Sequence, residues 1–224
     1  MKLQIIIAIC IFALANTSTN PTPPLWANQW QSNFIHETHD GIFGNGTTTG
    51  TMYYDWTNKL YRIDRATGKR DKYCGSVKKL KDTPCSHLVI GDTRYIYYPE
   101  LNFCCKCCSV QDGCGMLKPT WLQNATYDGQ TTLNKTSVDG WSVKGIQTNY
   151  YYELPETRIP MEIYMSPTDK FDFDASTYRA SIVDPNIFNL PSICKQSQAC
   201  TRISACGVVG IQSQLSKARN FFGF

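Results

Sequence analysis

The most unusual chemistry in the sequence lies in a short run of cysteines. The run reads CCKCC at residues 104–108, and Cys114 follows six residues later. Cys105 and Cys108 have the C-x-x-C spacing of a thiolate metal site. Disulfides are the simpler interpretation, because thiols in secreted proteins are usually oxidised and no His lies inside the run. A redox catalyst would instead carry an isolated C-x-x-C at the start of a helix, which this run does not resemble.

Counting the cysteines favours the same interpretation. The chain has 11 Cys, and Cys10 lies in an apolar N-terminal run that we expect to be removed, so an even number remains. An even set in an oxidising compartment predicts five disulfides. Adjacent cysteines rarely bridge each other, so the run needs partners elsewhere, and Cys74 and Cys85 are the obvious candidates, whether for disulfides or for a metal site. The predicted disulfide cysteines are Cys74, Cys85, Cys104, Cys105, Cys107, Cys108, Cys114, Cys194, Cys200 and Cys206.

Two groups of histidines could also do chemistry. Residues 36–40 read HETHD, and on a helix His36 and His39 would share a face and could hold a divalent cation. We favour a polar surface stretch, since the spacing is one residue short of the zinc-protease motif. His87 follows Cys85 and Ser86, which suggests a base beside a nucleophile. Neighbouring residues on a strand point to opposite faces, which argues against that pairing.

The remaining polar motifs fit strands and turns better than catalysis. The glycine-rich stretch 44–50 has no Lys in a phosphate-loop position and no helix after it, so we expect a turn leading into a strand. Asp169, Asp172 and Asp174 could form a calcium site or an acid pair, but Phe171 and Phe173 alternate with them as on a half-buried strand. We therefore expect no catalytic residue, no cofactor and no metal, and a protein that is not an enzyme.

The net charge and the N-terminus indicate partners and compartment. The chain has 224 residues with 22 Lys or Arg and 18 Asp or Glu, and the excess of +4 forms no basic block, so nucleic acid is not an expected partner. Residues 1–15 read as a signal peptide, with Lys2, an apolar run over 5–12 and the small-x-small pattern Ala13-Leu14-Ala15. An uncleaved anchor is the alternative, but the run is too short to span a bilayer comfortably. We expect a secreted or secretory-lumen protein that does not span the membrane.

Three glycosylation sequons support a secretory route. They lie at Asn45, Asn124 and Asn134, each followed two residues later by Thr. Each predicts a solvent-facing side chain in a host that glycosylates in its secretory pathway.

Short strand-like runs separated by turn residues fill the middle of the chain. Thr and Tyr are dense over 47–56, residues 60–64 alternate with period two, and further runs follow at 93–98 and between 125 and 174. Such spacing predicts a mainly β fold with one antiparallel sheet, because parallel strands would need helices between them. We expect a flexible N-terminal segment over 16–40, a curved β-sheet domain over 41–194 and a Cys-containing, partly helical tail over 195–224.

Several of these segments resemble ependymin-related proteins and their protist relatives. The matching segments are GTMYYDW (50–56), LYRID (60–64), IPMEIY (159–164), FDFD (171–174), DPNIF (184–188) and LPSIC (190–194). The resemblance implies a fold similar to the bacterial lipoprotein carriers: a single, strongly curved antiparallel half-barrel sheet with a hydrophobic cleft. It also implies that the cleft binds a lipid or another apolar ligand. The cysteine run and the tail after Cys194 depart from the family's pattern.

Apolar and aromatic residues at alternating strand positions are the candidate lining of that cleft. The residues are Tyr53, Ile63, Tyr95, Tyr97, Trp141, Tyr151, Ile163 and Met165. A cleft with such walls is the usual form of a lipid site, although the same residues could simply fill a core. The expected function is a secreted, non-catalytic, disulfide-bonded glycoprotein that binds a lipid or a hydrophobic small molecule. The alternatives are an extracellular structural or adhesion module and an orphaned protease pro-domain.

Overall fold

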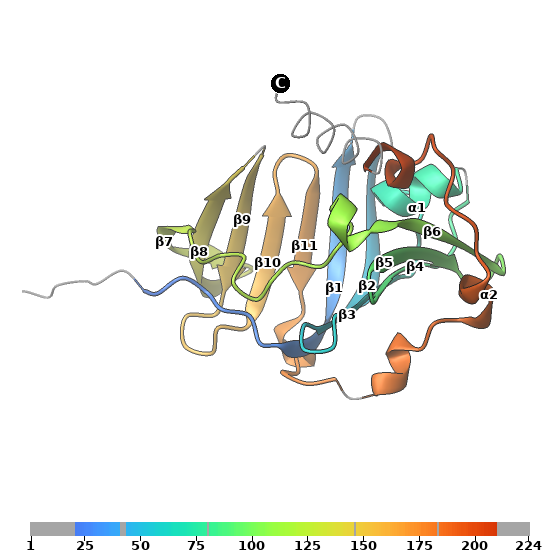
Figure 1. The fold of residues 1–224 in the computed structure, drawn as a ribbon. Coiled ribbons are helices and arrows are strands. Elements are labelled where there is room, and N and C mark those ends of the chain that lie inside the picture. The colour runs from blue at the N-terminus through green and yellow to red at the C-terminus, as the bar shows by residue number, and fades with distance from the viewer. Residues whose placement is uncertain (1–20, 41–43, 80, 146, 183, 210–224) are drawn as a thin grey trace, which may run out of the picture.

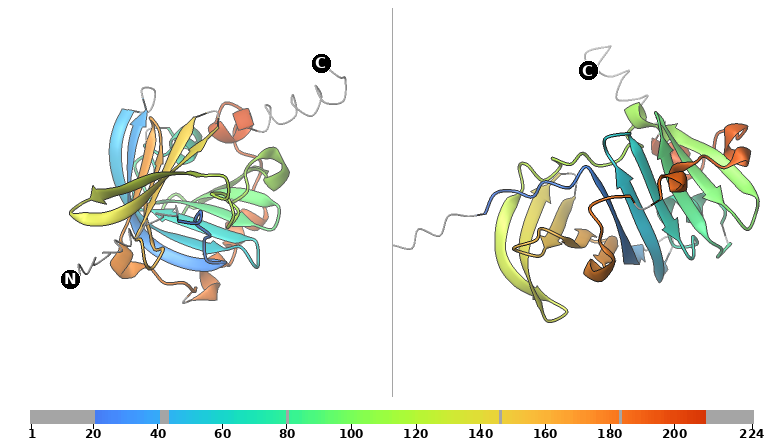
Figure 2. Two further views of the ribbon diagram at one scale, coloured as in Figure 1. Left: turned by 90° about the vertical axis from the view of Figure 1, so that its left-hand side faces the viewer. Right: turned by 90° about the horizontal axis from the view of Figure 1, so that it is seen from below.

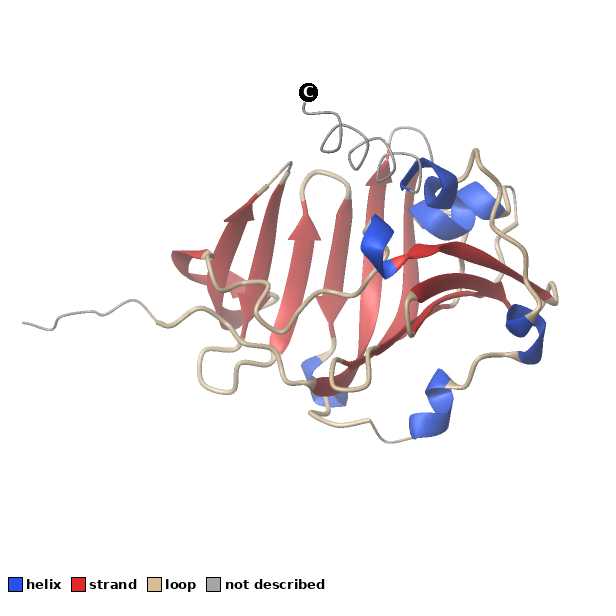
Figure 3. Ribbon diagram, in the orientation of Figure 1, coloured by secondary structure: helices blue, strands red, loops and turns tan. Residues whose placement is uncertain are grey.

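The structure is a computed structural model that describes residues 21–40, 44–79, 81–145, 147–182 and 184–209. Eleven antiparallel strands form one sheet that curls strongly around one face, with a few short helices at its rim (Figures 1, 2 and 3). The predicted fold class, one curved antiparallel sheet with disulfides and short helices, is confirmed.

The strands are β1 (Gln29–Asp40), β2 (Gly44–Asp55), β3 (Leu60–Arg65), β4 (Cys85–Ile90), β5 (Thr93–Tyr98), β6 (Phe103–Ser109), β7 (Thr126–Leu133), β8 (Thr136–Lys144), β9 (Thr148–Glu153), β10 (Pro160–Met165) and β11 (Asp169–Phe173). The helices are α1 (Lys72–Val77), α2 (Ser192–Lys195) and the 3-10 turns η1 (Val110–Asp112), η2 (Ala175–Thr177) and η3 (Pro185–Phe188).

The sheet is built from two meanders that meet in its middle. Its strand order is β6-β5-β4-β3-β2-β1-β11-β10-β9-β8-β7, so the first and last strands pair with each other. In that pair Phe34 lies opposite Phe173, and His36 lies opposite Phe171. Strands β6 and β7 therefore lie at opposite edges, and the crossover over residues 110–125 must travel the full width of the sheet. It does so across the face around which the sheet curls (Figure 1), which we call the inner face.

An aromatic cluster holds the crossover and the N-terminal segment on the inner face. Trp26, which precedes β1, packs edge-to-face on Trp30, Tyr54 and Trp121 with ring centroids 5.2, 5.5 and 5.5 Å away. The Tyr54 hydroxyl donates a 2.9 Å hydrogen bond to the carbonyl oxygen of Leu117 in the crossover. Leu122, also in the crossover, is fully buried. Edge-to-face packing is favourable for aromatic rings, so these contacts fix both covering segments in place.

The assignment of residues 16–40 to a flexible segment is wrong for its second half. Residues 29–40 form β1, which lies at the centre of the sheet between β2 and β11. Its inner-face residues include Ser32, His36 and Thr38, all buried. Because these polar side chains take positions that usually carry apolar ones, the period-two pattern of a strand was hidden. The predicted signal peptide lies outside the described residues.

All ten expected cysteines are joined in five disulfides, but the run has different partners from those expected. Cys74 and Cys85 bridge each other across the connection between α1 and β4. The run on β6 is joined instead to the C-terminal tail, and one bridge closes a short loop after β6. These bridges are Cys104–Cys194, Cys105–Cys200, Cys107–Cys206 and Cys108–Cys114.

The tail forms an extension of the sheet edge rather than a long helix. The Lys106 amide of β6 donates to the Gln198 carbonyl at 2.8 Å, and the Cys200 amide donates back to the Lys106 carbonyl at 2.8 Å. Residues 196–204 are not helical, and the chain is helical again only over 205–209. The rest of the expected tail helix, residues 210–224, lies outside the described part. Three cysteines along an edge strand force the tail to follow that strand, which explains why it does not coil there.

Candidate functional site

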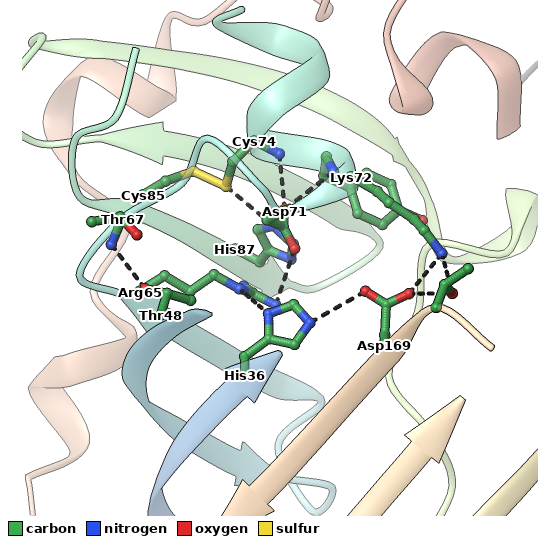
Figure 4. Close-up of polar contacts among 12 residues, drawn as sticks. His36, Thr48, Arg65, Thr67, Asp71, Lys72, Cys74, Cys85, His87 and Asp169 are labelled. Carbon is green, nitrogen blue, oxygen red and sulfur yellow. Dashed lines mark hydrogen bonds and ion pairs between the residues drawn. A yellow bond between two sulfur atoms is a disulfide. The ribbon is translucent and has the colours of Figure 1, made fainter. Parts of the chain in front are cut away.

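A cavity of about 260 Å³ opens on the inner face between the two meanders. Its walls come from β1, β2, β3, β4, β5, β10 and β11, from α1 and from the two covering segments. The apolar and aromatic wall consists of Trp26, Met52, Tyr54, Tyr61, Ile63, Tyr73, Leu117, Ile163, Met165 and Phe171. The charged and polar lining residues are His36, Arg65, Asp71, Lys72, His87, Arg94 and Asp169. The polar contacts join into one network, which we call the polar end of the cavity (Figure 4).

Asp71 is the centre of one half of this network. It caps the N-terminus of α1, where its Oδ1 accepts from the backbone amides of Tyr73 (3.1 Å) and Cys74 (2.9 Å). The same atom lies 2.8 Å from Nε2 of His87, and Oδ2 lies 3.1 Å from Nη2 of Arg65. Burial raises the pKa of Asp71, but the Arg65 charge and the hydrogen bonds from His87 and the Cys74 amide outweigh it and hold the pKa well below its usual value. Asp71 is therefore a buried carboxylate with a partner on each of its oxygens.

Asp169 on β11 is the centre of the other half. Its Oδ2 accepts from Nζ of Lys72 (2.6 Å) and from the Thr168 hydroxyl (2.6 Å), and its Oδ1 lies 3.2 Å from Nε2 of His36. Burial raises the pKa of Asp169, but the hydrogen bonds from His36, Lys72 and Thr168 outweigh it and lower the pKa to about 2. This acid is also charged at neutral pH.

The two histidines of the polar end are neutral at neutral pH. Burial lowers the pKa of His87 to about 4, although Asp71 opposes this shift. Burial also lowers the pKa of His36, against the hydrogen bond to Asp169. Nδ1 of His36 lies 3.4 Å from Nε of Arg65, which can only donate. The proton of His36 therefore sits on Nε2 and points to Asp169. Both rings act here as hydrogen-bonding groups rather than as charges.

The candidate nucleophile and metal ligands beside the cavity are already bonded to other groups. Sγ of Cys74 lies 3.4 Å from Nε2 of His87, but it is bonded to Cys85 and cannot act as a nucleophile. Asp71, Cys74 and His87 lie close enough to hold a metal ion, yet the sulfur is in a disulfide and the other two are bonded to each other. Among the described lining residues there is no Ser, Thr or free Cys.

The structure brings five of the eight expected cleft residues to the inner face. Ile63, Ile163 and Met165 line the cavity, while Trp141 and Tyr151 are buried beside it in the aromatic cluster. Tyr53, Tyr95 and Tyr97 are half-buried and do not line it. They alternate with Met52 and Tyr54 on β2 and with Ile96 and Tyr98 on β5, so they lie on the outer face. The prediction that these three residues lie on strands is correct, but they lie on the outer face of the sheet and not in the cleft.

The charged residues of the polar end were not expected at the site. Arg65 and Asp71 lie in a stretch rich in Lys and Arg, a composition typical of exposed segments, yet they are only 4% and 6% exposed. One signal could have found Arg65: the alternation of Tyr61 and Ile63 on β3 places it on the same face. His36 lies in the predicted polar surface stretch, but it is buried and paired, while His39 is exposed on the other face.

The fold and the site together define a class of protein: an open, curved antiparallel sheet with a mostly apolar cavity on its inner face. The chain belongs to the family described as Domain of unknown function (DUF8395), whose model matches residues 25–194. A search of curated proteins finds no match to the sequence. Among the described residues, none of the helices has the length and apolarity needed to cross a membrane.

Solved structures with similar folds share little sequence with this chain. An uncharacterized conserved protein from Thermus thermophilus is 9% identical over 77% of this chain and 90% of its own, with a TM-score of 0.47. A LolA superfamily protein from Nitrosomonas europaea is 8% identical over 75% of this chain and 92% of its own, with a TM-score of 0.33. A putative outer membrane lipoprotein-sorting protein domain from Vibrio parahaemolyticus is 8% identical over 72% and 89%, with a TM-score of 0.35. At such TM-scores these likenesses carry no argument about function.

Proposed function

We propose that this protein is a secreted, non-catalytic glycoprotein that binds a lipid or another apolar ligand on the inner face of its sheet. The observation that carries the proposal is the cavity of about 260 Å³ with a largely apolar wall. Met52, Ile63 and Phe171 contribute to this wall. A ligand that covers such surface gains roughly 25 cal/mol per Å² of apolar area removed from water, and no side chain needs to react.

The covalent features of the chain support the secreted part of the proposal. Five disulfides are typical of an oxidising compartment, and Asn45, Asn124 and Asn134 are all exposed, as a glycosylated side chain must be. The proposal includes the cleaved signal over 1–15 and a Cys-containing tail after residue 194. It also includes a relationship to ependymin-related modules, which rests on the sequence segments given above.

The test is to express the full precursor in a eukaryotic secretory host and to measure the purified protein by native mass spectrometry. The same sample is extracted into organic solvent and the extract is analysed for lipids. We expect excess mass that moves into the solvent phase, and an apparent melting temperature that rises when the extract is added back, by mass action on the folded state. In a separate measurement, loss of mass on digestion with an N-glycosidase shows whether the sequons are glycosylated.

A pair of variants with the same new side chain controls this experiment. Met165→Trp adds bulk to the cavity wall, whereas Ile35→Trp adds it to the outer face, where Ile35 is 45% exposed. The first variant should lose most of the extractable mass and the second should keep it. A mass that matches only the glycosylated polypeptide in every sample would instead favour a structural or adhesion module.

A further inference from the structure

Among the described residues, Arg65 is the one charged residue of the polar end with a buried hydrogen-bond donor that has no partner. Arg65 is 4% exposed and lies at the end of β3, on the cavity wall. Its Nη2 lies 3.1 Å from Asp71, and its Nε points to Nδ1 of His36 at 3.4 Å. Its Nη1 is buried and has no hydrogen-bond partner in the described part of the chain. A buried donor of a charged group without an acceptor is costly, so this nitrogen requires an explanation.

No carboxylate oxygen of the polar end forms a hydrogen bond with Nη1 in the described part of the chain. Asp71 already accepts from two backbone amides, from His87 and from Nη2 of Arg65. Asp169 already accepts from Lys72 and Thr168 and is paired with His36. Each carboxylate oxygen thus already has at least one partner, and an acceptor on a bound molecule would complete the hydrogen bonding of Nη1.

The charges of the cavity point the same way. Arg65, Lys72 and Arg94 line it as cations, and Asp71 and Asp169 line it as anions. With both histidines neutral, one positive charge remains without a counter-charge in the lining. One singly charged anion would balance it. Arg is also the residue best suited to this task, because its planar fork matches the two oxygens of a carboxylate.

Resting on the proposed function, we propose that the ligand is a single-chain amphiphile with a carboxylate head, which binds Nη1 of Arg65. Its chain lies along the wall formed by Ile63, Ile163, Met165 and Phe171. The carboxylate completes the hydrogen bonding of the guanidinium and balances the surplus charge. Arg65 is thus a specificity-determining residue, which selects a fatty-acid-like carboxylate over neutral or cationic lipids.

The cavity has room for one chain of moderate length. At roughly 30 Å³ for a water-sized group, 260 Å³ holds about nine such groups, which is close to an eight-carbon acid. Affinity should rise with chain length up to this size and then level off.

The test compares ligands that share one eight-carbon chain and differ only in the head. Purified full-length protein, stripped of lipid by solvent exchange, is titrated calorimetrically with octanoate, 1-octanol and octyltrimethylammonium at neutral pH. Octanoate should bind about tenfold or more tightly than octanol, as expected for a charge-assisted hydrogen bond in a buried site. Octyltrimethylammonium should bind more weakly than octanol.

Two variants on β3 test whether Arg65 causes the preference for octanoate. Arg65→Lys keeps the positive charge for Asp71 but removes the forked donor, so octanoate should bind about tenfold more weakly while octanol changes little. Arg62→Lys is the matched control, because Arg62 also lies on β3 but pairs with Asp64 on the outer face. It should leave the affinity for octanoate unchanged. If Arg65→Lys fails to fold, the comparison of the three ligands on the wild-type protein still tests whether the cavity prefers a carboxylate head.

The outcomes separate this inference from the proposed function. Equal binding of octanoate and octanol would overturn carboxylate recognition and leave apolar binding intact. An octanoate preference that survives Arg65→Lys in a folded protein would overturn the role of Arg65. If no eight-carbon ligand binds and the native protein carries no extractable lipid, both proposals fail.

Discussion

Two buried acids on the inner face show how strongly local donors decide the charge of a carboxyl group. Asp169 has three side-chain donors, and its pKa falls to about 2. Glu153 at the end of β9 is 1% exposed and lies 2.9 Å from Nε of Arg158. There, burial raises the pKa to about 7, since Arg158 only partly offsets it and the nearby charge of Asp139 adds to it. The surroundings of Asp169 stabilise its charged form, whereas the surroundings of Glu153 destabilise its charged form.

The raised pKa of Glu153 predicts the sign of a pH effect on stability. Between the ordinary pKa of 4.5 and about 7 the folded state binds a proton that the unfolded state has released, so this group's stabilising contribution is lost as pH rises through that window. Glu153→Gln lacks this titration. Its free energy of unfolding relative to wild type should therefore rise with pH, by at most ~1.4 kcal/mol per pH unit.

Urea unfolding of both proteins at several pH values between 4.5 and 8 measures this difference. The histidines are common to both proteins, so their contributions cancel. Glu156→Gln, at an exposed position in the next turn, is the control and should show no comparable trend. A relative stability that falls with pH would contradict the assignment.

At the scale of elements, the edge strand β6 and the tail form a covalently joined unit. Three disulfides connect them, with sequence separations of 90, 95 and 99 residues. Backbone hydrogen bonds between Lys106 and residues 198 and 200 run between these bridges. The tail thereby covers an edge that would otherwise present unpaired backbone groups to other chains.

Because three neighbouring disulfides join the same two segments, we predict that removing one of these long-range bridges has an effect on stability similar to removing the short-range bridge. Cys105–Cys200 closes a long loop and Cys74–Cys85 spans only 11 residues, so a simple loop-entropy argument ranks the first well above the second. The neighbouring bridges already close the long loop, so the added constraint is short. We expect Cys105→Ser/Cys200→Ser and Cys74→Ser/Cys85→Ser each to lower the free energy of unfolding by about 2–4 kcal/mol.

Denaturant unfolding of the two double variants checks this expectation. Removing all three bridges to the tail should cost much more than any single one, because the long loop then opens. A loss for Cys105→Ser/Cys200→Ser that far exceeds that of the other double variant would mean that its neighbours do not share the constraint.

At the scale of the whole molecule, two consecutive meanders share one core. The aromatic cluster takes Trp30 and Tyr54 from the first meander and Trp141 and Tyr151 from the second. The pairing of β1 with β11 joins them in the sheet, and the crossover spans both on the inner face. Neither meander can bury its inner face without the other, which makes independent folding of the halves unfavourable.

The shared core predicts a single cooperative unfolding transition. Tryptophan fluorescence reports on the cluster and far-UV circular dichroism on the strands, and the two should give the same midpoint in denaturant. Phe34→Ala, at the join between β1 and β11, should lower both midpoints together, since Phe34 is 2% exposed. Two separated transitions in either protein would show that the meanders unfold independently.

The sequence alone was sufficient for the fold class, because strand patterns are local. Period-two alternation and short turns indicated one antiparallel sheet, and an even number of cysteines indicated five disulfides. Local pattern also identified Ile63, Ile163 and Met165 as candidate cleft residues. It failed for β1, where buried polar residues such as Ser32 and His36 do not look like a core strand.

Only the tertiary structure decided the site and the disulfide partners. Which face of β2 or β5 is the inner one depends on partner strands and covering segments far away in the sequence, so Tyr53, Tyr95 and Tyr97 could not be placed from alternation alone. The polar end joins His36, Arg65, Asp71 and Asp169 from four separate elements. A buried charge is stable only beside its partner, and the pairing of β1 with β11 brings these partners together.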